Sequence, residues 1–185
     1  MRECVQITEF NQNVRVLPSG IQGAGLGLFT NRPFKKGEKI CDYTGEMTNC
    51  VEGNPSKYLL EARWLNNKTN KYEDWYLDAT KQPFGYGRYI NDAGDMYQGK
   101  LAEELQTPYH TNCRYGEEID PNVVWYNDVG SYKVPIYARM DIPKDVELFA
   151  TYGLPYWTNY KAYVKGEDPN ILMNEKYKQV TKKFV

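Results

Sequence analysis

Three short segments decide the fold of this chain: GYGRYIND at residues 85–92, TNCRY at residues 111–115 and ELFATYG at residues 147–153. One such segment alone would carry little information, because short motifs recur by chance. Several segments in a fixed order are far more specific. Whether these three segments identify a fold therefore depends on further segments upstream of residue 85.

Three further segments lie upstream: GAGLGLF at residues 23–29, YTGE at residues 43–46 and LDAT at residues 77–80. The glycines of the first follow G-x-G-x-G and not the G-x-G-x-x-G of a dinucleotide-binding fold, and no strand-turn-helix unit surrounds them. A dinucleotide site is therefore rejected. The alternating glycines predict a loop whose backbone turns tightly or approaches a ligand.

The composition narrows the possible functions. A chain of 185 residues suits one domain with a single core. Its net charge of -1 gives no basic stripe, so direct binding to nucleic acid is not expected. Two acidic pairs, Glu103–Glu104 and Glu117–Glu118, flank the TNCRY segment. They either attract a basic peptide or form solvated loops.

Cysteine and histidine are too sparse for a metal site or a nucleophilic triad. The four cysteines show no C-x-x-C spacing, and the single histidine is His110, so no zinc site is expected. We expect Cys113 to be a packed thiol in a reducing compartment. The chain lacks G-x-S-x-G, P-loop and H-E-x-x-H motifs, and neither a secretory signal nor a membrane span is expected.

Short β-type runs dominate the first 150 positions. They are bounded by Gly, Pro, Asn or Asp and lie at residues 14–17, 39–43, 74–77, 123–126 and 133–138. Residues 32–38 and 141–147 form two similar turns that contain proline, each leading into a strand-like run. Two helices are expected at the end of the chain, starting at Pro155 and Pro169.

Together the segments cover about residues 20 to 157, and their order resembles the signature of the SET-domain methyltransferases. The resemblance implies a β-rich α+β fold of several short-stranded sheets, with a threaded, pseudoknot-like C-terminal part and C-terminal helices. We expect an N-terminal flank at residues 1–19, the SET domain at 20–157 with an insertion at about 93–110, and a helical segment at 158–185. The cysteine-rich segment that follows many such domains is missing.

The resemblance also implies S-adenosylmethionine as methyl donor, S-adenosylhomocysteine as product, and no metal. Matching positions make the cofactor-binding residues Ala24, Gly25, Leu26, Tyr58, Asn91, Asp92 and Trp157. Asp92 stands where the family usually has histidine. Trp157 either covers the adenine ring or anchors the last helix.

The catalytic residues implied by the same motifs are Tyr152, Tyr43 and Tyr115. Tyr152 ends the Glu-Leu-x-x-x-Tyr block and matches the catalytic tyrosine, whereas Tyr43 is expected to line the lysine channel. Ala150 replaces an aromatic residue that many members have, and Tyr115 stands where it fills that gap. This favours mono- or dimethylation. Arg88 and Asn112 are expected to hold the fold.

The implied function is methyl transfer to a lysine ε-amine in a basic peptide such as a histone tail, in the nucleus or else in the cytoplasm. Two alternatives stay open. One is a SET-like binding module without turnover, which Asp92 and Ala150 permit, and the other is a methyltransferase for a non-histone protein. No membrane partner is expected, and the oligomeric state stays open.

Overall fold

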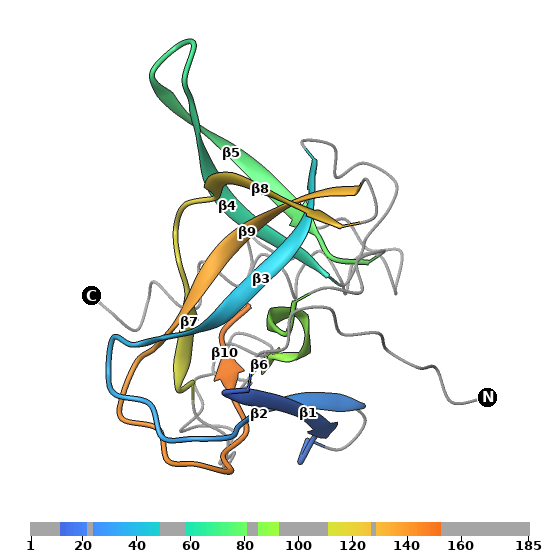
Figure 1. Ribbon diagram of the computed structural model, residues 1–185, viewed down its shortest axis with the longest axis vertical. Helices are drawn as coiled ribbons and strands as arrows, with labels where there is room; N and C mark the ends of the chain where they lie inside the picture. The colour runs from blue at the N-terminus through green and yellow to red at the C-terminus, as the bar shows by residue number, and fades with distance from the viewer. Residues whose placement is uncertain are drawn as a thin grey trace, which may run out of the picture. The chain divides into compact units, whose positions relative to one another are not determined.

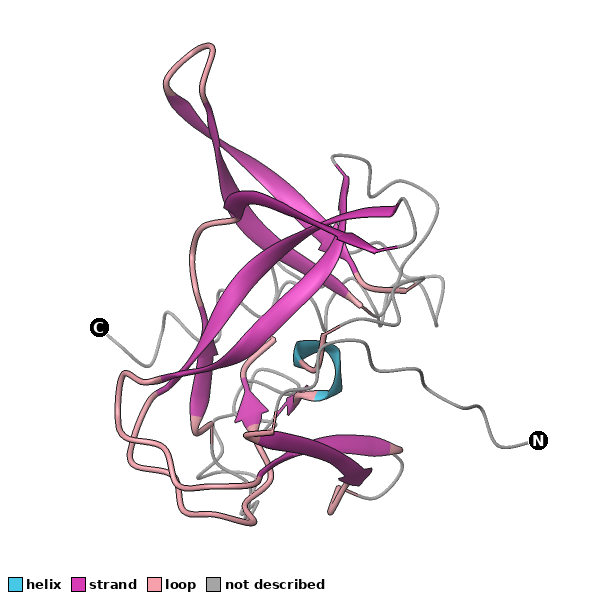
Figure 2. Ribbon diagram, viewed as in Figure 1, coloured by secondary structure: helices cyan, strands magenta, loops and turns pink. Residues whose placement is uncertain are grey.

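The computed structural model describes residues 12–21, 24–48, 58–80, 85–92, 111–126 and 129–152. Within these ranges the regular structure is strand-rich, with a single short 3-10 helix (Figures 1 and 2). The chain forms two compact units, one of residues 1–91 with 112–148 and one of residues 92–111 with 149–185. No helix among the described residues is long and apolar enough to cross a membrane.

The main sheet of the first unit has six antiparallel strands. Its order is β4-β5-β3-β9-β7, and β8 also pairs with β9. The strands are β3 (Lys39–Thr48), β4 (Leu59–Asn66), β5 (Lys71–Asp78), β7 (Cys113–Tyr115), β8 (Asp120–Tyr126) and β9 (Val129–Ala138). The β4–β5 hairpin projects beyond the other strands of this sheet (Figure 1). Strand β3 joins the β4–β5 hairpin to the strands around β9, because its first part pairs with β9 and its last three residues pair with β5.

Alternation along β9 builds the core of this unit. Val134 and Ile136 are fully buried and point to one face, since successive side chains of a strand alternate between faces. Tyr43 lies opposite Val134 and Cys41 opposite Ile136, so these β3 residues join the same apolar layer. Burying such side chains stabilises each by about 1.5–3 kcal/mol relative to leaving it in water.

A separate hairpin sheet of β1 (Val14–Pro18) and β2 (Leu26–Thr30) carries the glycine segment. The 3-10 helix η1 (Gly87–Tyr89) precedes Asn91 and has its first residue buried. Strand β2 contacts η1, and η1 contacts β3, so the hairpin, the short helix and the main sheet form one body within the first unit.

The second unit contains β10 (Phe149–Ala150), which pairs with β6 (Asn91–Asp92) where the chain passes from one unit to the other. Phe149 and Ala150 are both buried. The expected helices from Pro155 and Pro169, the insertion at about 93–110 and Trp157 lie outside the described residues. The helices, the threading and the domain boundaries therefore stay predictions.

All five predicted strand runs are confirmed, with longer bounds. The expected loop at the glycine segment is partly wrong, because Leu26–Thr30 form β2 and only the residues before them connect two strands. Pairing with β1 along the whole of β2 outweighs the weak strand preference of Gly27. Strand β4 was not predicted.

Candidate active site

The connection from β1 to β2 exposes the backbone that was predicted to bind the cofactor. Ala24, Gly25 and Leu26 are all exposed. The connection is closed by a hydrogen bond from Ser19 N to Gly25 O at 2.9 Å. Gly25 has φ of 79°, and among the described residues other than its chain neighbours no atom lies within 4 Å of the place where its Cβ would stand. The loop therefore leaves open space beside its backbone at this glycine.

Asn91 lies directly against this loop. Its Nδ2 donates to Leu26 O at 3.0 Å and to Glu147 Oε1 at 3.3 Å. The structure thus brings together four of the predicted cofactor residues, Asn91 and Ala24 to Leu26. It also shows that the Asn91 side chain supports the backbone of the loop.

Glu147 is a residue at this place that sequence reasoning missed. Its side chain is buried, and its carboxylate accepts hydrogen bonds from Ser19 Oγ at 2.6 Å and Gly20 N at 2.9 Å. A buried carboxylate needs such partners. Glu147 is the first residue of the ELFATYG segment, so the sequence drew attention to it. A single glutamate in a sequence does not show, however, which residues it will bind.

Tyr43 and Tyr115 form the aromatic part of the site. Their rings meet edge to face with centroids 5.9 Å apart and an interplanar angle of 87°. The register explains the meeting, because Tyr43 lies opposite Val134 and Tyr115 opposite Ile136, two residues on the same face of β9. Tyr43, predicted to line the lysine channel, and Tyr115, predicted to fill the gap left by Ala150, are therefore neighbours.

Tyr58 connects this aromatic pair to Arg88. The Tyr43 hydroxyl donates to the backbone carbonyl of Tyr58, and the Arg88 guanidinium lies 4.3 Å from the Tyr58 ring centroid. Arg88 Nη1 also donates to Ala79 O at 2.8 Å. These contacts agree with the expectation that Arg88 holds the fold, and they place Tyr58 beside the channel tyrosines.

Asp92 and Tyr152 lie in the second unit. Asp92 is buried, and its Oδ2 accepts a hydrogen bond from the backbone N–H of Tyr152 at 2.6 Å. Asp92 was expected to contact the cofactor. This geometry gives it a further role that the sequence did not predict, because its carboxylate fixes the backbone of the first candidate for the catalytic tyrosine.

Asn112 and Cys113 play the structural parts expected of them. Asn112 Nδ2 donates to the backbone carbonyl of Glu147 at 2.8 Å, and both residues are buried. Cys113 is 1% exposed, and burial raises the pKa of its thiol well above the usual range. A protonated, inaccessible thiol is no nucleophile, so the prediction of a packed thiol is confirmed. No three potential metal ligands gather anywhere in the described ranges.

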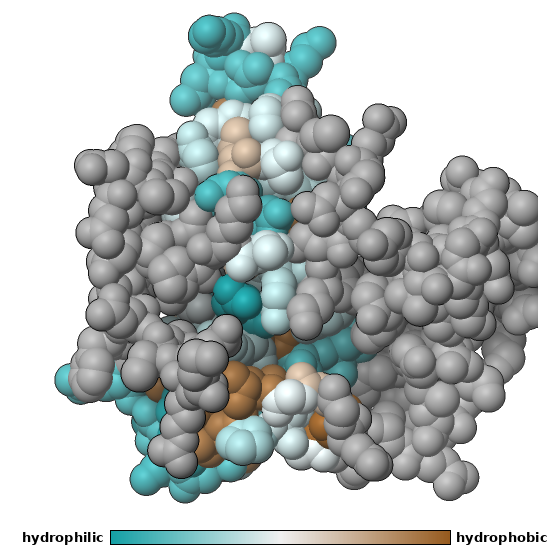
Figure 3. Space-filling view, turned by 90° about the vertical axis from the view of Figure 1, so that its right-hand side faces the viewer, coloured by the Kyte–Doolittle hydropathy of each residue, from teal (hydrophilic) through white to brown (hydrophobic). Residues whose placement is uncertain are grey.

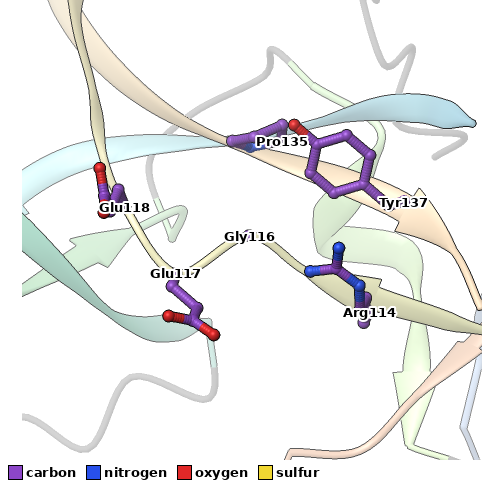
Figure 4. Close-up of a pocket in the computed structure, with 6 residues that line it drawn as sticks. All are labelled: Arg114, Gly116, Glu117, Glu118, Pro135 and Tyr137. Carbon is purple, nitrogen blue, oxygen red and sulfur yellow. The ribbon is translucent and has the colours of Figure 1, made fainter. Parts of the chain in front are cut away.

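A pocket of about 270 Å³ lies elsewhere on the first unit (Figure 4). It is lined by Arg114, Gly116, Glu117, Glu118, Pro135 and Tyr137. Arg114 lies opposite Tyr137 in the sheet, one residue out of step with Tyr115 and Ile136. The pocket therefore opens on the other face of the sheet from the Tyr43–Tyr115 pair and is not the predicted lysine channel.

The surface near the glycine loop is apolar. Leu17 and Leu26, from the two strands of the β1–β2 hairpin, are 37% and 45% exposed. The space-filling view shows apolar side chains gathered at the lower end of one face, over this hairpin (Figure 3). The loop residues predicted to meet the cofactor thus border on exposed apolar surface.

Among solved structures, the methyltransferase domain of human PR domain-containing protein 2 is similar, with 19% identity and a TM-score of 0.50 over 77% of this chain and 78% of that one. An active polycomb repressive complex 2 in the stimulated state gives 21% identity and a TM-score of 0.43 over 77% of this chain and 15% of that one. A ctPRC2 structure in an autoinhibited conformation bound to S-adenosylmethionine gives 24% and 0.43 over the same shares.

At 19% identity, the likeness to the methyltransferase domain of human PR domain-containing protein 2 shows a shared fold and nothing more. A search of curated proteins found no match. The SET domain family matches residues 25–153, which is more than half of the chain and includes all the segments discussed above except the first two residues of GAGLGLF. On this match, the chain belongs to the SET domain family.

Proposed function

We propose that this chain is a protein-lysine N-methyltransferase that uses S-adenosylmethionine and releases S-adenosylhomocysteine. Membership of the SET domain family over residues 25–153 carries the proposal. The Tyr43–Tyr115 pair, with centroids 5.9 Å apart, is the structural feature that supports it most directly. Tyrosine-lined apolar space is what the chemistry of lysine methylation requires.

The residues present fit the methyl donor. Ala24, Gly25 and Leu26 are exposed and are proposed to meet the donor's amino-acid part, and the absence of a side chain on Gly25 leaves room beside them. Tyr58, Asn91, Asp92 and Trp157 complete the proposed binding set. When bound, S-adenosylmethionine supplies an electrophilic methyl group on a sulfonium. It is the protein that must orient the amine toward this group.

The amine must lose its proton before it can attack. Free lysine has a pKa near 10.4, so keeping its amine neutral at physiological pH costs about 4 kcal/mol. An apolar channel lowers this cost, because desolvation disfavours the charged form. Tyr43 is 5% exposed and meets Tyr115 edge to face, so these rings provide such a wall. The same rings tolerate a methylated ammonium through cation-π attraction.

Each tyrosine has a proposed part. The Tyr152 hydroxyl would stand near the amine and the transferred methyl, and Asp92 would hold the Tyr152 backbone through the 2.6 Å hydrogen bond. Tyr43 would shape the channel. Tyr115 would limit the space left by Ala150, which favours addition of one or two methyl groups. Orientation and electrostatic fit then supply most of the catalysis.

The proposed substrate is a lysine in a basic peptide, with a histone tail as first choice, and the proposed location is the nucleus. Exposed carboxylates on the first unit would favour such a peptide, since Glu117 and Glu118 have side chains that are 77% and 54% exposed. No nucleic-acid partner and no membrane partner is proposed.

Labelled methyl transfer tests this function. Purified protein with labelled S-adenosylmethionine should methylate histones more strongly than a random lysine-rich peptide, and Tyr152→Phe should lower the rate at least about 100-fold. Equal activity of the Tyr152→Phe protein would remove Tyr152 from its proposed role.

Other outcomes separate the alternatives. Measurable binding of S-adenosylmethionine without transfer to any peptide would favour a binding module. Activity on a non-histone protein alone would move the substrate away from chromatin. A folded protein that neither binds S-adenosylmethionine nor transfers methyl groups would refute the proposal.

A further inference from the structure

The buried carboxylate of Glu147 accepts hydrogen bonds from two separate parts of the first unit. Ser19 Oγ donates to Oε1 at 2.6 Å, Gly20 N donates to Oε2 at 2.9 Å, and Asn91 Nδ2 donates to Oε1 at 3.3 Å. Glu147 itself is only 7% exposed. Three donors compensate the cost of taking this charge out of water, so each of them is tied to the carboxylate.

These donors act at the two ends of the connection between β1 and β2. Ser19 and Gly20 begin it, whereas Asn91 holds its end through the 3.0 Å bond to Leu26 O. Gly27 shows how close the carboxylate comes, because a Cβ there would stand 2.1 Å from Glu147 Oε1. The glycine at residue 27 is thus required by the carboxylate and not by a turn.

The middle of the loop depends on this anchor. Ala24 to Leu26 are exposed, and no apolar core covers them. Ser19 closes the loop twice, since its N–H donates to Gly25 O at 2.9 Å and its Oγ accepts from Ile21 N at 3.0 Å. Because Glu147 holds the Ser19 side chain, it also helps to fix the backbone at Ile21 and at Gly25.

We propose that Glu147 is a positioning residue for S-adenosylmethionine, which holds residues 19–21 and 24–26 of the β1–β2 connection in the conformation that binds the donor. The inference rests on the proposed function. Glu147 touches the loop and not the reacting atoms, so it acts on binding of the donor. Removing the Glu147 carboxylate therefore raises KM for S-adenosylmethionine and leaves kcat at saturating S-adenosylmethionine nearly unchanged.

Glu147→Gln tests the inference. The amide keeps the shape but has one acceptor oxygen in place of two, and its NH₂ group faces a donor. We expect S-adenosylhomocysteine to bind about 10-fold more weakly by titration calorimetry, and KM for S-adenosylmethionine to rise about as much. Ser19→Ala removes one donor and is expected to weaken binding about threefold. Glu61→Gln, the same change at an exposed residue of β4, should stay within about twofold of the parent protein.

Thermal unfolding of each variant separates positioning from folding. If Glu147→Gln does not fold, Ser19→Ala decides, because Ser19 is only partly buried. Unchanged affinity in folded Glu147→Gln or, failing that, in Ser19→Ala overturns the inference alone. A lower kcat with unchanged KM would do the same. A parent protein that binds no S-adenosylhomocysteine overturns the proposed function together with the inference.

Discussion

The backbone N–H of Tyr152 donates to Asp92 Oδ2 over 2.6 Å, and Asp92 is buried. A hydrogen bond to a charged acceptor contributes about 1.5–3 kcal/mol, enough to hold a backbone in one conformation. Where the family usually has histidine, this chain therefore has a group that accepts hydrogen bonds and fixes the residue proposed to be catalytic.

Replacing Asp92 by leucine should lower kcat about 10-fold, because about 1.4 kcal/mol of positioning is lost. Asp92→Asn keeps an acceptor oxygen and should retain most of the activity. Steady-state kinetics with varied S-adenosylmethionine distinguishes this role from a direct contact with the donor. If only KM for the donor changed, Asp92 would be a binding residue and not a positioning one. Asp141→Asn, at an exposed aspartate, is the matched control.

The hydroxyl of Tyr43 has a structural role that can be separated from its ring. Tyr43→Phe removes the hydrogen bond to the Tyr58 carbonyl but keeps the edge contact with Tyr115. The carbonyl still accepts from Ala79 N at 3.1 Å. The free energy of unfolding should therefore fall by only about 1 kcal/mol in urea titration. Tyr72→Phe, at a ring that is 50% exposed, should change it by less than about 0.5 kcal/mol, and an equal loss in both variants would contradict this reading.

At the scale of elements, the two similar turns pair with each other. Phe34 and Ile142 exchange both backbone hydrogen bonds, at 2.9 and 2.8 Å. Three residues after each of them the backbone has positive φ, 83° at Gly37 and 64° at Asp145. The sequence predicted two similar turns but not their pairing, because similarity between two segments does not show that they lie next to each other.

Gly37→Ala should destabilise the protein by about 1 kcal/mol. No atom lies within 4 Å of the Cβ position, so the cost comes from the left-handed backbone alone. Gly37→Asn should lose less, since asparagine tolerates this conformation. Urea titration of both variants tests the ranking. A larger loss in Gly37→Asn than in Gly37→Ala would show that side-chain crowding, and not φ, sets the cost.

The prediction of strands from sequence was incomplete where strand conformation depends on pairing with another strand. Residues 26–30 contain Gly27, which has a weak strand preference, yet they pair with β1, as at Arg15 and Phe29. Strand β4 carries charged and polar residues among its apolar ones, and its strand conformation comes from eight-residue pairing with β5. Such pairing is not local, and propensity alone does not report it.

At the scale of the molecule, the sequence segments contact one another within the first unit. Asn91 of GYGRYIND donates to Leu26 of GAGLGLF and to Glu147 of ELFATYG. Asn112 of TNCRY donates to the Glu147 backbone. The order of the segments was enough to predict the family. The buried carboxylate at their meeting point was not predicted, since two of its partners, Ser19 and Gly20, are over a hundred residues away in the chain and Asn91 is 56 residues away.

The whole molecule should lose stability at alkaline pH through Cys113. Burial raises the pKa of this thiol, with a small opposing effect of Arg139, while an unfolded cysteine titrates near about 8.5. Above that pH the unfolded chain releases a proton that the native state keeps. This contribution to stability is complete below about pH 8.5 and declines as pH rises toward the native pKa.

Between pH 8.5 and 9.5 the free energy of unfolding of the parent protein should fall about 1 kcal/mol more than that of Cys113→Ala. Urea titrations under reducing conditions at pH 7, 8.5 and 9.5 measure the difference. The alanine protein is less stable throughout, because a buried side chain is shortened, so the slope and not the level carries the test. Tyr76, whose pKa burial also raises, contributes equally to both proteins and cancels. Parallel pH profiles would mean that the Cys113 thiol is reached by solvent in the native state, contrary to its 1% exposure.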